Sequence, residues 1–102
     1  MKLEHKTMVR RYAKTLQEAN IPHEKIYVYG SVAKGKENPW SDIDLAVIGP
    51  AFGTDLIEEM VTLRMLAQEI NPAISPMPLR PEDLEDRFST LGQTVRKEGY
   101  LV

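Results

Sequence analysis

The stretch of residues 25–48 constrains the fold of this chain more than any other part of the sequence. Residues 25–29 are mostly β-branched and aromatic and stop at Gly30, which predicts a short strand ending in a turn. Residues 42–48 alternate apolar with more polar positions and stop at a glycine-proline pair, which predicts a second strand beside the first. The positions of this strand expected to face the core are Ile43, Leu45 and Val47. We expect a short helix over 31–36 and a loop to join the two strands.

Amphipathic helices are expected on both sides of this stretch, because apolar residues recur there at spacings of three and four. The first covers residues 7–20 and stops before Pro22, since proline disfavours helical geometry in the residue that precedes it. The longest covers residues 55–70, with Thr54 as its N-cap. The residues of this helix that form one apolar stripe are Leu56, Met60, Leu63, Ala67 and Ile70.

The last third of the chain completes the expected order of elements. Residues 73–79 contain two prolines, so they can form only an edge strand or an irregular one. A short helix is expected from Pro81, and another over 89–98 that Gly99 closes in the left-handed conformation. Residues 100–102 fit either a strand or a segment that docks on a partner. The predicted class is α/β, with a small mixed sheet flanked by helices.

Length and composition limit the kinds of protein that this chain can be. At 102 residues it has the length of one domain, and we expect residues 1–102 to form a single one. Its formal net charge of −2 offers no basic excess for binding nucleic acid. No apolar run approaches the roughly 18 residues that a membrane-spanning helix needs. The charged N-terminus and the absence of cysteine fit a cytoplasmic protein.

A glycine-serine pair stands where the first strand is expected to turn into a helix. Glycine at Gly30 lets the backbone approach a bound group closely, and the free N–H groups of a helix start favour an anion. Ser31 adds a hydroxyl donor, and Lys34 follows closely enough to neutralise phosphate charge. These three residues predict a site for the phosphates of a nucleotide.

Two aspartates open the second expected strand. Asp42 and Asp44 are two residues apart, so on a strand both carboxylates point to the same face. They repel each other unless a cation lies between them or one of them takes a proton. Hard oxygen ligands suit Mg²⁺, which proteins usually hold with one or two carboxylates together with the phosphates of a substrate. Asp42 and Asp44 are therefore the candidate metal ligands.

The spacing of these residues resembles a known family. Gly30-Ser31, ten intervening residues and then Asp42-x-Asp44 looks like the signature of the minimal nucleotidyltransferases of the polymerase-β-like superfamily. The resemblance runs over residues 25–48 and extends loosely to 97–99. It implies the polymerase-β-like nucleotidyltransferase core for this chain.

The resemblance also implies an activity, a cofactor and a partner. In that family the glycine-serine turn grips the phosphates of the donor, and the two aspartates hold the metals. Carried over, Gly30, Ser31 and Lys34 bind the nucleotide, while Asp42 and Asp44 are the catalytic residues and the Mg²⁺ ligands. The implied reaction transfers a nucleoside monophosphate from ATP to a hydroxyl group. Many such domains are antitoxins that pair with a helical protein of the HEPN type, some by adenylylating it, which implies an oligomer and a partner tyrosine as acceptor.

One position departs from the family pattern. The family usually supplies a third carboxylate from a later strand, but residues 73–79 contain no acid, and Ser75 stands at about the expected place. The acids over 82–86 are interpreted as a solvated turn of the next helix. General acid–base help contributes about 10²–10⁴-fold to a rate, so the gap weakens base-assisted attack. The sequence leaves two functions open: an Mg²⁺-dependent nucleotidyltransferase, or a nucleotide-binding antitoxin with weak or no transfer that neutralises a helical partner by contact.

Overall fold

A four-stranded mixed sheet forms the centre of the fold in a computed structural model that describes all residues, 1–102. Its strands are β1 (Lys25–Tyr29), β2 (Ile43–Ile48), β3 (Ile74–Leu79) and β4 (Tyr100–Leu101). They lie in the order β3-β2-β1-β4, and β1 is antiparallel to both of its neighbours whereas β2 and β3 are parallel. The predicted α/β class with a small mixed sheet is confirmed.

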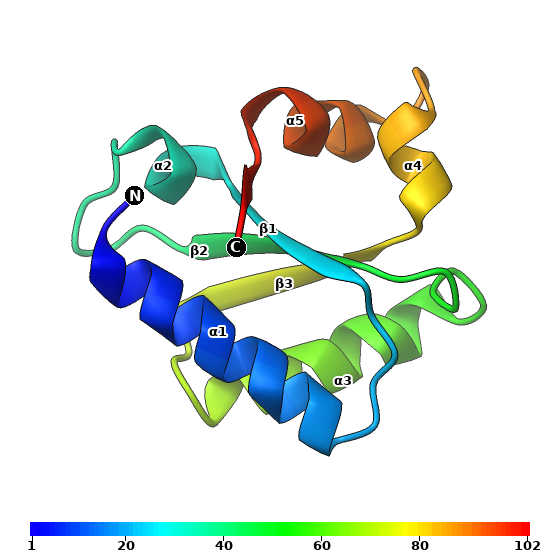
Figure 1. The fold of residues 1–102 in the computed structure, drawn as a ribbon, viewed down its shortest axis with the longest axis horizontal. Helices are drawn as coiled ribbons and strands as arrows, with labels where there is room; N and C mark the ends of the chain where they lie inside the picture. Colours follow the sequence, from blue (N-terminus) through cyan, green and yellow to red (C-terminus); the bar gives the residue numbers. More distant parts are fainter.

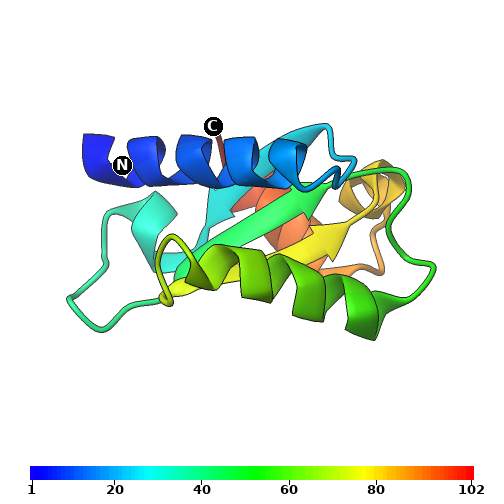
Figure 2. The ribbon, with the colours of Figure 1, turned by 90° about the horizontal axis from the view of Figure 1, so that it is seen from below.

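Helices cover both faces of this sheet. They are α1 (Leu3–Glu18), α2 (Gly30–Lys34), α3 (Leu56–Gln68), α4 (Pro81–Glu85) and α5 (Thr90–Glu98). Figure 1 shows α1 and α3 on one side of the sheet and α4 and α5 on the other, with α2 at the end of β1. Figure 2 shows α1 and α3 lying across the same face. None of the helices is long and apolar enough to cross a membrane.

Two apolar clusters of unequal size lie on the two faces of the sheet. The larger one, under α1 and α3, includes the predicted core residues Ile43, Leu45 and Val47 of β2. At its centre the buried Tyr12 donates a hydrogen bond of 2.8 Å from its hydroxyl to the Leu63 carbonyl oxygen, and burial raises the pKa of this phenol. The smaller cluster, under α4 and α5, consists of Ala46, Ile48, Leu79 and Val95. On this second face Asp44 therefore lies just beyond the apolar part of β2.

The two prolines of β3 explain why this strand lies at the edge. The Ile43 N–H donates to the Ala73 carbonyl oxygen (2.8 Å) and the Gly49 N–H donates to the Leu79 oxygen (2.9 Å), so odd-numbered residues of β3 face β2. Backbone groups alternate in direction along a strand, which turns Pro76 and Pro78 toward the outer edge, where they lack an N–H to offer. The predicted edge strand is confirmed, and its prolines discourage a further strand from pairing there.

Helix ends are where the sequence-based predictions were least accurate. Helix α1 begins at Leu3, four residues before the predicted start, and its N-cap Lys2 makes no side-chain capping bond that the sequence could have signalled. The N-cap of α3 is Asp55 and not Thr54, because the Asp55 carboxylate accepts a bond from the Glu58 N–H (3.2 Å).

The C-terminal end differs from the prediction as well. Gly99 has φ −69° and ψ 141°, which is extended and not left-handed. The chain continues directly into β4, which pairs with β1 at Tyr27 and Val28, and an extended Gly99 leads into that strand. The open choice for the last residues is thus resolved in favour of a strand.

Candidate active site

The glycine-serine turn lies directly against one of the two aspartates. β1 ends at Tyr29 and α2 begins at Gly30, whose φ of +74° is one that residues with a side chain rarely adopt. A methyl group built on Gly30 would overlap the Asp44 Oδ2 atom. Glycine at this position therefore serves two purposes, because it permits the turn and leaves room for the Asp44 carboxylate.

The two aspartates differ in their surroundings. Asp44 is half-buried at the second position of β2, opposite Tyr29 of β1, whereas Asp42 is exposed and precedes the strand. Burial, and secondarily the charge of Asp42, raises the pKa of the Asp44 carboxyl. Both causes disfavour the ionised form of Asp44, the burial because it removes water from the carboxylate and Asp42 because it carries the same charge.

The carboxylates fit a hard divalent cation but form an incomplete set of ligands. Neither Asp42 nor Asp44 takes part in any of the ion pairs of the chain, so their charge is not compensated from within. Nowhere do three or more histidine, cysteine, aspartate or glutamate side chains gather as a metal site. Two carboxylates with open positions for phosphate oxygens and water are a donor set that suits Mg²⁺.

Ser75 lies beside Asp44 on the neighbouring strand. The parallel register of β2 and β3 pairs the Cα atoms of these two residues, and both are half-buried. Side chains of paired residues point to the same face of a sheet, so a carboxylate at this position would share the face of Asp44. The acids that follow β3 are far away: Asp83 accepts bonds from the Arg80 backbone N–H (2.9 Å) and guanidinium (3.2 Å) beyond the opposite end of the strand.

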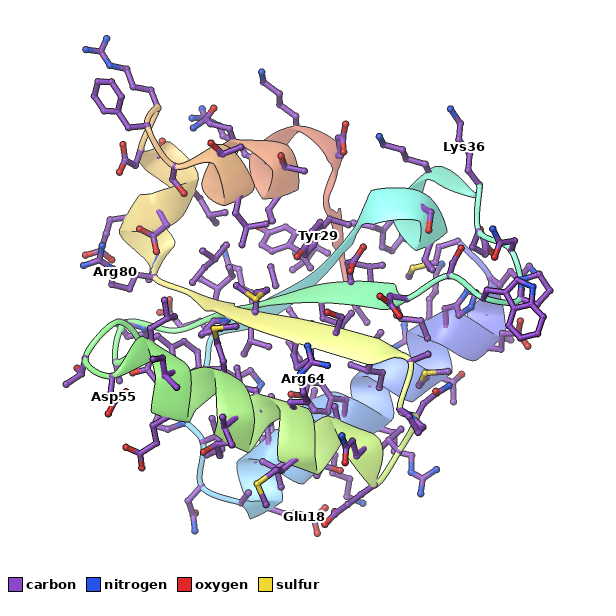
Figure 3. The ribbon with its side chains drawn as sticks, turned by 180° about the vertical axis from the view of Figure 1, so that it is seen from behind. Glu18, Tyr29, Lys36, Asp55, Arg64 and Arg80 are labelled. Atoms are coloured by element: carbon purple, nitrogen blue, oxygen red, sulfur yellow. The ribbon has the colours of Figure 1, made fainter.

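The lysines that follow the turn are placed less favourably for a phosphate. The Lys34 ammonium forms an ion pair of 3.1 Å with Glu98 of α5, and both side chains are well exposed. Lys36 is exposed after the end of α2, and in Figure 3 its side chain points away from the sheet. Lys34 would have to exchange Glu98 for a phosphate in order to bind a nucleotide.

Tyr29 is a further residue of this region that the sequence-based search did not single out. It pairs with Asp44 across β1 and β2, and Figure 3 shows it in the layer between the sheet and α5. Burial, and secondarily the charge of Asp44, raises the pKa of its phenol. The available signal was its position: it is the last strand residue before Gly30, and a second strand beside the first was expected to follow.

Comparison with known proteins agrees with this arrangement. Residues 9–91 match the nucleotidyltransferase domain family. A search of curated protein sequences found no match. Among solved structures, the chain is similar to a toxin-antitoxin crystallised with AMP-PNP, with a TM-score of 0.67 and 29% sequence identity over 90% of this chain and 69% of that one.

A second solved structure gives the same result. The chain is similar to a mutant of the toxin-antitoxin MntA-HpeT, with a TM-score of 0.65 and 26% identity over 91% of this chain and 69% of that one. The match to the family spans most of the chain, and it includes the glycine-serine turn and both aspartates. The chain therefore belongs to the nucleotidyltransferase domain family, and its resemblance to the minimal nucleotidyltransferases of toxin-antitoxin pairs is confirmed.

Proposed function

We propose that this chain transfers a nucleoside monophosphate from ATP to a hydroxyl group, with Mg²⁺ held by Asp42 and Asp44. The observation that carries the proposal is the contact between the Gly30 turn and the Asp44 carboxylate. It brings the backbone that would hold the phosphates next to the carboxylates that would hold the metal. Membership of the nucleotidyltransferase family supports the class of reaction.

The residues of the site have distinct roles in this reaction. The backbone at Gly30 and the hydroxyl of Ser31 hold the phosphates of the donor, because N–H and O–H groups can donate hydrogen bonds to the phosphate oxygens. The acceptor oxygen forms a bond to the α-phosphorus, the bond between the α- and β-phosphates breaks, and pyrophosphate leaves while the hydroxyl proton passes to solvent. A divalent cation bound by Asp42 and Asp44 would supply positive charge to the phosphate oxygens.

We further propose that the acceptor is a tyrosine of a helical, HEPN-type protein with which the chain forms a toxin-antitoxin pair in the cytoplasm. Structures similar to this chain are toxin-antitoxins, and one of them was crystallised with AMP-PNP, an analogue of ATP. Residues 1–102 would act as one nucleotidyltransferase domain, and the partner would carry the acceptor.

A second candidate function is supported by Ser75. With a hydroxyl beside Asp44 where the family places an acid, the site lacks a nearby group to take the acceptor proton. The chain would then bind a nucleotide and neutralise its partner by contact, with little or no transfer. The two candidates differ in whether neutralisation of the partner needs the carboxylates.

A labelling experiment separates these candidates. The purified chain is incubated with Mg²⁺, ATP labelled at the α-phosphate and the helical partner, and toxicity of the partner is measured in parallel. If the chain transfers a nucleotide, the partner should become labelled. An Asp42→Asn/Asp44→Asn variant should then lose both the labelling and the neutralisation of the partner. Neutralisation that survives in this variant, without label on the wild-type reaction, would establish the contact mechanism instead.

Replacing Ser75 by aspartate should increase transfer if a missing acid limits the reaction. A carboxylate in register with Asp44 would add a base or a third metal ligand, so we expect about a 10²-fold faster transfer, within the range of general base catalysis. Tighter Mg²⁺ binding, measured by calorimetry, should accompany it. A Ser75→Ala control should leave both quantities near the wild-type values. Equal rates in the Ser75→Asp variant and the control would show that this position does not limit transfer.

A further inference from the structure

Helix α3 carries a second apolar stripe that the core does not cover. Leu63 and Ala67 are buried against the sheet and α1, as expected for one face of the helix. On the opposite face, Ile57, Val61 and Met65 repeat every four residues, with exposed fractions of 78%, 52% and 65%. Residues four apart form a continuous ridge on a helix surface, and such ridges pack into the grooves of another helix. We refer to these three side chains as the outer stripe.

Charged residues border the outer stripe unequally. At 100° per residue, Glu58 and Glu69 fall along one edge of the stripe and Arg64 falls along the other. All three are exposed, and none of them forms an ion pair within the chain. Figure 3 shows Asp55 at the start of the helix and Arg64 along its length. A partner that fits this face therefore needs basic groups on the side that meets Glu58 and Glu69.

A cavity of about 280 Å³ adjoins the acidic edge of the stripe. Its apolar wall is made by Ile21, Pro22 and Phe52, and Asp55 and Glu58 stand among its polar lining residues. A long basic side chain suits such a cavity, because its methylene groups can lie on the apolar wall while its charge stays near the carboxylates. The cavity and the acidic edge would thus both be complemented by lysine or arginine side chains of a partner.

The rest of the surface points to a helix rather than a strand as the occupant. The prolines of β3 close one edge of the sheet to strand addition, and β4, at the other edge, has only two residues. A second copy of α3 fits poorly in an antiparallel pair, because the two-fold axis would set the Glu58 edge against the same edge of the other copy. Charge therefore disfavours an antiparallel homodimer through α3, whereas a different helix with basic residues along the edge that meets Glu58 and Glu69 would complement it.

We propose that the outer stripe of α3 and the cavity beside it bind an amphipathic helix of a partner protein that carries lysine or arginine along one edge. The proposal rests on the proposed function, since it takes this helix to belong to the protein that the chain modifies or neutralises. α3 leads through residues 69–73 into the start of β3, next to Ser75 and Asp44. A partner on α3 would lie over the face of the sheet opposite Asp44, with the C-terminal end of α3 at the end of the sheet that carries the carboxylates.

Two synthetic helical peptides of about 20 residues test this directly, a length at which isolated helices become stable. Both carry an apolar stripe of the same residues, and they differ only in having lysine or glutamate along one edge. Titrated into ¹⁵N-labelled protein, the lysine peptide should shift the amide signals of α3 and of residues 51–55 and bind at least tenfold more tightly than the glutamate peptide. A Glu58→Lys/Glu69→Lys variant should reverse this preference.

Matched variants identify the surface. Val61→Glu should weaken the lysine peptide at least tenfold, whereas Phe88→Glu, at an apolar residue of 81% exposure outside α3, should leave its binding unchanged. Equal affinity for both peptides, no saturable binding, shifts centred elsewhere, or a wild-type dimer that Val61→Glu dissociates would overturn the proposal. An Asp44→Asn variant should bind the lysine peptide like the wild type, so loss of transfer and loss of docking can be told apart.

Discussion

An Asp44→Asn variant is expected to lose nucleotidyl transfer by about 10³-fold or more, since stabilising the charge of the transferring group is a large part of such catalysis. The amide keeps the size of the side chain, so the contact with Gly30 is preserved. The variant removes the half-buried charge that would hold the cation next to the phosphates. The measurement is the rate of label transfer from ATP, with Mg²⁺ affinity determined by calorimetry.

In the absence of metal, the Asp44→Asn variant should be more stable than the wild type. The pKa of Asp44 is raised in the folded state, so between the ordinary carboxyl pKa and the raised one the folded protein binds more protons than the unfolded chain. Stability contributed by this group is therefore lost as the pH rises through that window. At neutral pH, asparagine should raise the free energy of unfolding only modestly, because a half-exposed charge is largely screened by solvent.

Thermal unfolding at two pH values and with Mg²⁺ checks this expectation. Below the ordinary carboxyl pKa the advantage of the Asp44→Asn variant should disappear, because the wild-type carboxyl is then protonated in both states. Added Mg²⁺ should raise the Tm of the wild type more than that of the variant. A variant less stable than the wild type at neutral pH would contradict the idea that burial, together with the charge of Asp42, disfavours the ionised Asp44 carboxylate.

A Gly30→Ala variant should be damaged in both fold and function. Its φ of +74° costs a residue with a side chain about 1–2 kcal/mol, and the added methyl group must also displace the Asp44 carboxylate. We expect a total loss of about 3 kcal/mol in the free energy of unfolding, as for other overpacked sites. Mg²⁺ affinity should fall at least tenfold because Asp44 moves. Chemical denaturation and calorimetry measure the two effects.

Gly35 supplies the matched control. Its φ is +68°, but a methyl group there meets no atom within 4 Å. A Gly35→Ala variant should therefore lose only the backbone part, about 1 kcal/mol, and bind Mg²⁺ like the wild type. If the two variants behaved alike in stability and in metal affinity, the contact between Gly30 and Asp44 would have no role in the site.

Local patterns were enough to predict three of the four strands of the sheet. The β-branched and aromatic run of β1 was predicted with its observed bounds, and β2 was one residue shorter than expected. The edge position of β3 followed from its prolines alone, because a residue without an N–H cannot donate the backbone hydrogen bonds that a central strand needs on both sides. Helix caps were predicted less well. Several polar residues near the start of a helix compete for the same N–H groups, and only the folded geometry decides which of them accepts the hydrogen bond.

Helix α3 shows where periodicity is ambiguous. The inward stripe was identified in outline, although Leu56 at its start is half exposed. The outer stripe of Ile57, Val61 and Met65 lies outside that predicted stripe and was not recognised as a stripe of its own, because a helix that is apolar on two faces has no single polar side. Packing against the sheet confirmed that the predicted stripe is buried at Leu63 and Ala67 and showed that the outer stripe is left at the surface.

The candidate site divides in the same way. The sequence by itself determined the residue types, the i, i+2 spacing of Asp42 and Asp44, and the glycine-serine turn. Contacts between elements far apart in the chain decided the rest: the contact of Gly30 with Asp44, the pairing of Ser75 with Asp44, and the ion pair between Lys34 of α2 and Glu98 of α5. Spacing along the chain is fixed by covalent geometry, whereas register and contacts between elements depend on how the whole core packs.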